Sequence, residues 1–268
     1  MIVNAGQGKQ MPFADVGELK THYALTGDKE PALVLSNSLG TDFSMWDPQM
    51  VELQRRFRVL RYDTRGHGQS SVTPGGYTIE QLGRDVLGLL DALRLDRVHF
   101  CGLSMGGMIG MWLGVHAPDR LHRLVLSNTA ARIGTKEMWN ARIAIVRKDG
   151  MKSVAAAVIE RWFTPEFRAA SAEKVVRAQR MLESSPPEGY AACCAAIRDM
   201  DQREAVAQIK VPTLVIYGGS DPVTPASDAR FLTDQIPGAA KVDLAAAHLS
   251  NVEQAGAFTE AVADFLSR

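Results

Sequence analysis

The strongest candidate for a catalytic residue in this chain is a serine with a glycine two positions to either side, in Gly102-Leu103-Ser104-Met105-Gly106. A short β-type run precedes this pentapeptide and a helical segment follows it, as in the elbow that presents a nucleophilic serine. Glycines suit that turn because the serine is held in a strained backbone conformation where the strand and the helix nearly touch. The pattern predicts that Ser104 is a nucleophile; the plainer alternative is a turn whose serine caps a helix.

A nucleophilic serine needs a histidine base and an orienting carboxylate, which follow it in the order acid, then histidine. His248 lies in a loop after a late strand, and Asp221 directly follows the apolar run 211–217. Asp201 and Asp243 compete less well, because the first ends a helical region and the second falls within a strand. The other histidines precede the serine or lie near its helix: His22, His67, His99, His116 and His122. The expected set is Ser104, Asp221 and His248, against the plainer interpretations of a turn aspartate and a surface histidine.

An oxyanion formed at the carbonyl attacked by this serine needs two backbone N–H donors. One comes from the residue after the nucleophile, here Met105, and the other from the loop after an early strand. That loop is 36–40, and we expect Ser38 to be its donor, with Leu39 as the alternative because loop register is uncertain by one residue.

Strands and helices alternate around these residues, which predicts an α/β fold with a mostly parallel, doubly wound sheet. Helices are expected at 46–56, at 79–93 after a Thr78–Gln81 capping box, after Ser104, after Pro225, and from Val252 to Phe265. The expected strands are 19–25, 32–35, 58–62, 98–101, 124–126, 211–217 and 241–244.

The alternation stops in one long segment, which is rich in helix-forming Ala, Arg, Lys, Glu and Met and has no clear strand. We therefore expect a helical lid, or cap, at 132–203, inserted into one core. The core would comprise a first part, 1–131, and a second part, 204–268.

Composition excludes several classes of function. The 268 residues carry 30 Lys and Arg against 30 Asp and Glu, a formal net charge of zero, so we expect no nucleic-acid partner. No apolar stretch of about 18 residues occurs and residues 1–6 lack a leader pattern, so we expect a cytoplasmic protein without a membrane partner. Three cysteines offer no metal-ligand spacing, and we expect no metal. Assembly into a homo-oligomer is left open.

The chain resembles the α/β-hydrolase superfamily over nearly its whole length, including a D-x-R-G-x-G-x-S loop at 63–70. Most members carry His-Gly in the oxyanion loop, where this chain has Ser36-Asn37. Segments 37–42, 127–135 and 189–194 resemble the 3-oxoadipate enol-lactonase family of the β-ketoadipate pathway. The resemblance implies a serine esterase that hydrolyses 3-oxoadipate enol-lactone to 3-oxoadipate through an acyl-enzyme during aromatic compound catabolism. It implies no cofactor.

The lactone implied by this resemblance carries a free carboxylate, which a lid cation should bind because a buried unpaired charge is costly. Arg132, Arg142 and Arg161 are the candidates, with Trp139 as an apolar wall; each is otherwise a solvated lid charge or a core aromatic. Rival functions are a generic carboxylesterase or lactonase, a cofactor-free perhydrolase, and, from another class, a hydrolase-fold ligand receptor. A haloalkane dehalogenase is disfavoured, because it uses Asp where Ser104 stands.

Overall fold

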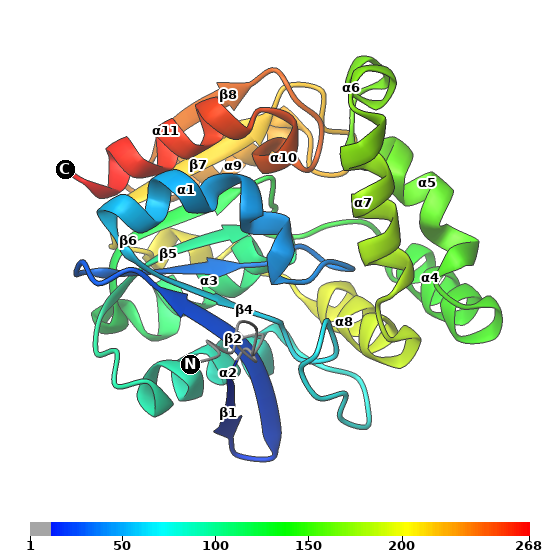
Figure 1. Cartoon of the computed structure of the whole chain (residues 1–268), viewed down its shortest axis with the longest axis horizontal. Coiled ribbons are helices and arrows are strands. Elements are labelled where there is room, and N and C mark those ends of the chain that lie inside the picture. Colours follow the sequence, from blue (N-terminus) through cyan, green and yellow to red (C-terminus); the bar gives the residue numbers. More distant parts are fainter. Residues whose placement is uncertain (1–11) are drawn as a thin grey trace, which may run out of the picture.

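An eight-stranded sheet forms the centre of the structure, a computed structural model that describes residues 12–268 (Figure 1). Residues 1–6, in which we expected no leader, lie outside the described range. Within that range, no helix combines the length and apolar character needed to cross a membrane. The strands are β1 Phe13–Val16, β2 Leu19–Thr26, β3 Ala32–Ser36, β4 Arg58–Tyr62, β5 Val98–Leu103, β6 Leu121–Ser127, β7 Thr213–Gly218 and β8 Ala240–Leu244.

The strand order is β1-β2-β4-β3-β5-β6-β7-β8. Pairs β1–β2 and β2–β4 are antiparallel, and every pair from β4 to β8 is parallel. The predicted fold class, mostly parallel and doubly wound, is therefore confirmed. Strand β1 was not predicted, because it has only four residues and pairs with β2 alone at the edge of the sheet.

Helices cover both faces of this sheet. Helices α1 (Asp47–Arg56) and α11 (Ala255–Leu266) pack against each other on one face. Helices α2 (Ile79–Ala92) and α3 (Met105–His116) pack together on the other, which also carries α9 (Ala226–Gln235) (Figure 1). The expected helix from Val252 to Phe265 is divided, since Gln254 separates α10 (Ser250–Glu253) from α11.

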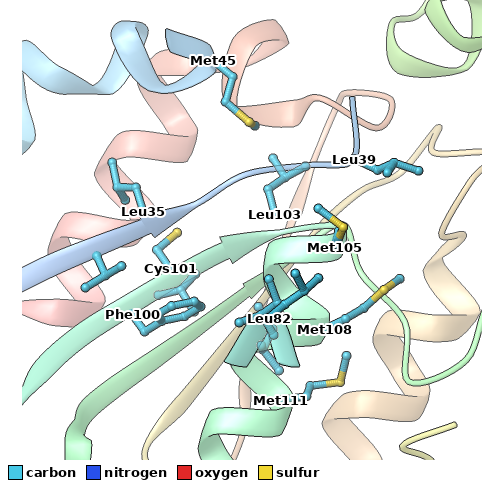
Figure 2. Packing of buried hydrophobic residues seen from close by; sticks show 14 of the residues in the cluster. Leu35, Leu39, Met45, Leu82, Phe100, Cys101, Leu103, Met105, Met108 and Met111 are labelled. Carbon is cyan, nitrogen blue, oxygen red and sulfur yellow. The ribbon is translucent and has the colours of Figure 1, made fainter. Parts of the chain in front are cut away.

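Apolar side chains fill the space between the sheet and these helices. Strand β5 is buried along its whole length, which suits a central parallel strand covered on both faces. Figure 2 shows Phe100 and Leu103 of β5 among Leu82 of α2 and Met108 and Met111 of α3. This packing fixes β5 and α3, the two elements that Ser104 joins.

Five helices lie between β6 and β7 and gather at one end of the sheet (Figure 1). They form the lid, as the predicted fold class requires: α4 Lys136–Asp149, α5 Lys152–Trp162, α6 Pro165–Ala170, α7 Ala172–Glu183 and α8 Pro187–Asp199. The chain enters and leaves the lid side by side, because Gln202 N donates a 2.8 Å hydrogen bond to Ala131 O. The boundaries 132 and 203 themselves stay a prediction.

Candidate active site

The carboxyl ends of the parallel strands bring distant segments to one edge of the sheet. Strands β3, β5, β6, β7 and β8 all end there. The residues that follow include Ser38, Ser104, Asn128, Asp221 and His248, each on a loop or turn beyond its strand. Ligands of open α/β sheets bind at this edge, so the topology concentrates polar side chains where a site is expected.

The Ser104 turn has the strained geometry of an elbow. Ser104 has φ 56° and ψ −114°, and it joins β5 directly to α3. A Cβ on Gly102 would overlap the carbonyl of Gly106, and a Cβ on Gly106 would overlap the carbonyl of Ser36. Glycine is therefore required at both positions by the close approach of strand and helix. Ser104 is held further by its N–H, which donates to Ser127 O at 2.8 Å.

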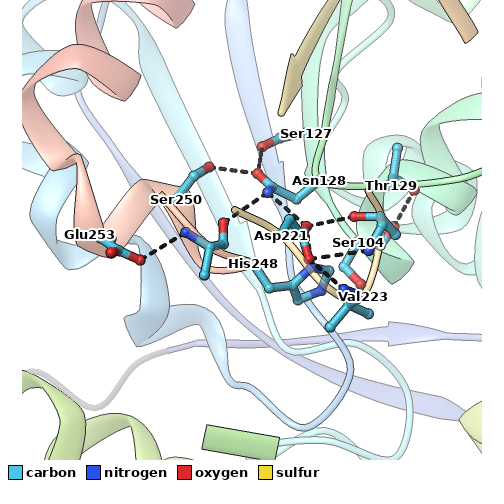
Figure 3. A network of polar contacts seen from close by, with 11 residues as sticks. Ser104, Ser127, Asn128, Thr129, Asp221, Val223, His248, Ser250 and Glu253 are labelled. Carbon is cyan, nitrogen blue, oxygen red and sulfur yellow. Dashed lines mark hydrogen bonds and ion pairs between the residues drawn. The ribbon is translucent and has the colours of Figure 1, made fainter. Parts of the chain in front are cut away.

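Asp221 and His248 form a buried pair (Figure 3). The two side chains meet through His248 Nδ1 and Asp221 Oδ2, 2.8 Å apart. Asp221 also accepts hydrogen bonds from Val223 N at 2.8 Å, Thr224 N at 3.1 Å and Thr224 Oγ1 at 2.7 Å. Burial raises the pKa of Asp221, but the imidazole of His248 and the surrounding donors outweigh it and hold the pKa below its ordinary value. Asp221 is thus kept ionised beside the ring.

Ser104 and His248 line the same cavity. Figure 3 shows the Ser104 side chain beside the imidazole of His248, with no hydrogen bond drawn between them. Serine–histidine contacts are often long in unliganded hydrolases and tighten when substrate binds. The structure brings the three predicted residues to one place, and their catalytic roles belong to the proposal below.

Asn128 connects the parts of this network, and the sequence did not reveal its role. Its Nδ2 donates to Asp221 Oδ2 at 3.0 Å and to Ala247 O at 3.1 Å. Its Oδ1 accepts from Ser127 Oγ at 2.9 Å and from Ser250 Oγ at 2.6 Å. Its position just after a buried strand was the available signal, because that position lies at the same sheet edge as the other site residues. Asn128 therefore fixes the Asp221 carboxylate relative to the His248 loop.

The predicted oxyanion donors lie on two neighbouring segments. Met105 is the first residue of α3, so its N–H has no acceptor within the helix. Ser38 and Leu39 both line the cavity. Ser38 N–H donates to the thioether of Met45, with 3.4 Å between N and Sδ, and thioether sulfur is a weak acceptor. The Ser38 N–H is thus bonded only to a weak acceptor.

His67 supports the oxyanion loop from the D-x-R-G-x-G-x-S segment. Gly40 N–H donates to His67 Nε2 at 2.9 Å, so this nitrogen carries no proton. Burial lowers the pKa of His67 to about 4, which keeps the ring neutral and able to accept that bond at neutral pH. Asn37 adds a second tie, since its carbonyl accepts from Gly106 N at 3.0 Å. The loop is therefore anchored on both sides of Ser38.

The cavity above Ser104 has a volume of about 170 Å³ and is roofed by the lid. Three of the four lid residues singled out from sequence line it, namely Trp139, Arg142 and Arg161. Arg132 does not: its Nη1 lies 3.5 Å from Asp201 Oδ2, and its side chain is 49% exposed. The structure thus separates Arg132 from the other candidates.

Arg142 and Arg161 face the cavity without a carboxylate partner among residues 12–268. Burial and then the nearby guanidinium of Arg142 lower the pKa of Arg161. Two cations held close together in a cavity produce a strongly positive potential. The arrangement suits an anionic group of a small ligand.

Across residues 12–268, no group of three or more His, Cys, Asp or Glu side chains is arranged to hold a metal ion.

The chain belongs to the alpha/beta hydrolase fold family, which matches residues 31–255. It is similar to 3-oxoadipate enol-lactonase 2 of Acinetobacter baylyi, with 44% identity over 252 residues and 94% of each chain covered. 3-Oxoadipate enol-lactonase 1 of the same organism is 41% identical over 239 residues, covering 89% of this chain and 90% of its own. The crystal structure of the enol-lactonase from Burkholderia xenovorans matches with a TM-score of 0.95 and 47% identity, covering 96% of this chain and all of that one. The predicted hydrolase class and family resemblance are confirmed.

Proposed function

We propose that this enzyme hydrolyses 3-oxoadipate enol-lactone to 3-oxoadipate, with Ser104 as nucleophile, His248 as base and Asp221 as its orienting acid. The observation that carries the proposal is one cavity that holds Ser104 and His248 together with two unpaired guanidinium groups, Arg142 and Arg161. A small lactone with a free carboxylate matches both halves of that cavity. Relatives that carry the name 3-oxoadipate enol-lactonase, at 44% and 41% identity, supply the particular substrate.

The reaction begins when His248 Nε2 removes the proton of Ser104 Oγ and this oxygen attacks the lactone carbonyl carbon. Collapse of the tetrahedral intermediate breaks the ring C–O bond and leaves an acyl-enzyme whose released oxygen is an enolate. The enolate leaves without prior protonation and then takes, on carbon, the proton that His248 removed from Ser104, which gives the ketone and returns His248 to its neutral form. Water then gives a proton to His248 and attacks the ester, which releases the new carboxylate and restores Ser104.

Backbone N–H groups of Met105 and Ser38 bind the oxyanion in this mechanism, with Leu39 as the alternative to Ser38. The oxyanion draws the Ser38 N–H away from Met45 Sδ, an exchange that favours the much stronger, charged acceptor. Each such donor is worth about 3 kcal/mol of barrier. A weak resting partner is useful because a strong one would have to be broken in every turnover.

Arg142 and Arg161 bind the carboxylate that does not react. Pairing with this carboxylate removes the cost of keeping two guanidinium groups close together in the cavity. Because the group lies away from the reacting carbonyl, its binding fixes the lactone relative to Ser104. This pairing predicts preference for an anionic lactone over a neutral ester of similar size.

Spectrophotometric loss of the enol-lactone tests the proposal. We expect Ser104→Ala to abolish turnover, and Arg142→Ala and Arg161→Ala each to lower kcat/KM about 10- to 100-fold, the effect of losing one charge-assisted hydrogen bond. Arg132→Ala, which changes an arginine outside the cavity, is the matched control and should retain wild-type kinetics.

Three results contradict the proposal, taken from that assay, from the same kinetics with neutral esters, and from thermal unfolding in the presence of the lactone. Unchanged turnover in Ser104→Ala excludes Ser104 as the nucleophile. Faster turnover of neutral esters, indifferent to both arginine changes, indicates a generic carboxylesterase or perhydrolase. Stabilisation by the lactone without multiple turnover indicates a ligand receptor.

A further inference from the structure

The backbone on both sides of His248 is held by hydrogen bonds that the mechanism above does not use. Ala247 N–H donates to Glu253 Oε2 at 3.0 Å. Leu249 N–H donates to the carbonyl of Trp162 at 3.0 Å, and Trp162 belongs to the lid. The loop that carries His248 is therefore tied to α10 on one side and to the lid on the other.

The same carboxylate also reaches the lid. Thr164, between α5 and α6, donates through Oγ1 to Glu253 Oε1, and its N–H lies 3.4 Å from Glu253 Oε2. Thr164 Oγ1 in turn accepts from Phe167 N at 3.2 Å and caps α6. Glu253 thus bridges the lid at Thr164 and the His248 loop at Ala247 through one side chain.

The lid segment that contacts Glu253 directly follows residues that line the cavity. Arg161 and Trp162 both line it, and Thr164 follows two residues later. A shift of this segment would move the Arg161 guanidinium and the Trp162 carbonyl together. It would also pull on Leu249, whose N–H binds that carbonyl.

We propose that Glu253 is a positioning residue that couples the lid to His248, so that the lid holding the substrate carboxylate also fixes the imidazole relative to Ser104. The inference rests on the proposed function for the role of His248 as base. Glu253 does not line the cavity and touches no reacting atom. Its effect passes through Ala247 and Thr164.

Two substitutions separate the arms of the bridge. Glu253→Gln keeps the size of the side chain, but its amide oxygen cannot serve all three donors that the carboxylate serves. Thr164→Val removes the hydroxyl on the lid side, together with the cap that it gives α6, and Thr164→Ser keeps both. Glu260→Gln, an exposed glutamate on α11 with the same change of charge, is the matched control.

We expect Glu253→Gln to lower kcat for the enol-lactone about tenfold while KM changes less than twofold, because positioning of His248 affects the chemical step. Thr164→Val should lower kcat in the same direction, and both Thr164→Ser and Glu260→Gln should match wild type. Thermal unfolding reports any loss of folded protein.

A kcat within twofold of wild type in folded Glu253→Gln overturns the inference. So does a loss of activity that follows the folded fraction alone, because a purely structural role predicts that result. An activated neutral ester assayed with Ser104→Ala keeps the two hypotheses apart. Turnover of this ester by Ser104→Ala contradicts the role of Ser104 as nucleophile. If turnover requires Ser104 but Glu253→Gln keeps the wild-type kcat, only the coupling of the lid to His248 is contradicted.

Discussion

Removing the side chain of Asn128 tests whether the network beneath His248 is held as tightly as its contacts suggest. Asn128→Ala deletes four hydrogen bonds, namely the 3.0 Å bond to Asp221, the 3.1 Å bond to Ala247 O, and the bonds accepted from Ser127 Oγ at 2.9 Å and Ser250 Oγ at 2.6 Å. A bond to an ionised group is worth about 2 kcal/mol and a bond to a neutral carbonyl about 1 kcal/mol. Asn128 also has φ 43°, a left-handed conformation that costs alanine about 1 kcal/mol. With one bond to an ionised group, three to neutral groups and the backbone strain, we expect the free energy of unfolding to fall by about 6 kcal/mol.

Activity should fall as well, because Asp221 loses one of the donors that hold its pKa down and its oxygens in place. We expect kcat to fall 10- to 100-fold in the folded variant, with KM little changed. Urea unfolding followed by circular dichroism gives the stability, and steady-state kinetics of the enol-lactone gives kcat.

Two further variants test why Asn128→Ala loses stability: one separates the hydrogen bonds from the backbone strain, and the other is a control. Asn128→Gly removes the same hydrogen bonds but relieves the left-handed strain, so it should be the milder change. Asn140→Ala alters an exposed asparagine of α4 and should stay within about 0.5 kcal/mol of wild type. A loss below 1 kcal/mol in Asn128→Ala, with kcat unchanged, would refute the assignment of Asn128 as the residue that orients Asp221 and the His248 loop.

Three other predictions concern the surroundings of the site. Burial lowers the pKa of His67 to about 4, so on acidification the unfolded chain binds a proton at a higher pH than the folded protein does. The free energy of unfolding should therefore fall by about 3 kcal/mol as the pH is lowered from 6.5 to 4. In His67→Gln, the plot of unfolding free energy against pH should be flatter over this range. Gly106→Ala would drive a methyl group into the carbonyl of Ser36, and a strongly lowered Tm with lost turnover should result; an unaltered Tm would contradict the close packing. Asp85→Asn should cost about 3 to 5 kcal/mol in urea unfolding, because it leaves the buried Arg65 guanidinium, now 2.6 Å from Asp85, without its charge partner.

Local sequence patterns predicted the helices and strands that are long enough to show a regular apolar spacing. Strand β5 and helix α2 have continuous or regularly spaced apolar residues, and Thr78 Oγ1 accepts from Gln81 N at 3.0 Å as its capping pattern predicts. Strand β1 was missed because four residues at a sheet edge carry too little periodicity. The break at Gln254 was missed because the apolar spacing continues through it, while the backbone leaves helical values there, with φ −116° and ψ 50°.

Some residues of the candidate site could be predicted from the sequence, and others could not. Chain order and strand ends indicated Ser104, Asp221 and His248, because the topology of a parallel sheet fixes where residues after its strands lie. The contacts of Asn128 and Glu253 join segments up to 122 residues apart and leave no local pattern. Arg132 lies in the segment before α4, whereas Arg142 and Arg161 lie on α4 and α5 and line the cavity, a difference that charge and spacing alone do not determine.

The lid leaves and rejoins the sheet through a single neck, closed by the bond between Gln202 N and Ala131 O. A segment whose two ends meet can be exchanged without changing the separation that the remaining chain must span. Replacing the helices beyond this neck with those of another hydrolase would keep Ser104, Asp221 and His248 on the sheet, but it would change both the roof of the cavity and the lid contacts to Leu249 and Glu253 that hold the His248 loop. The neck is thus a graft point for new substrate preferences, and a grafted lid must again supply a carbonyl for Leu249 N–H and a hydroxyl for Glu253.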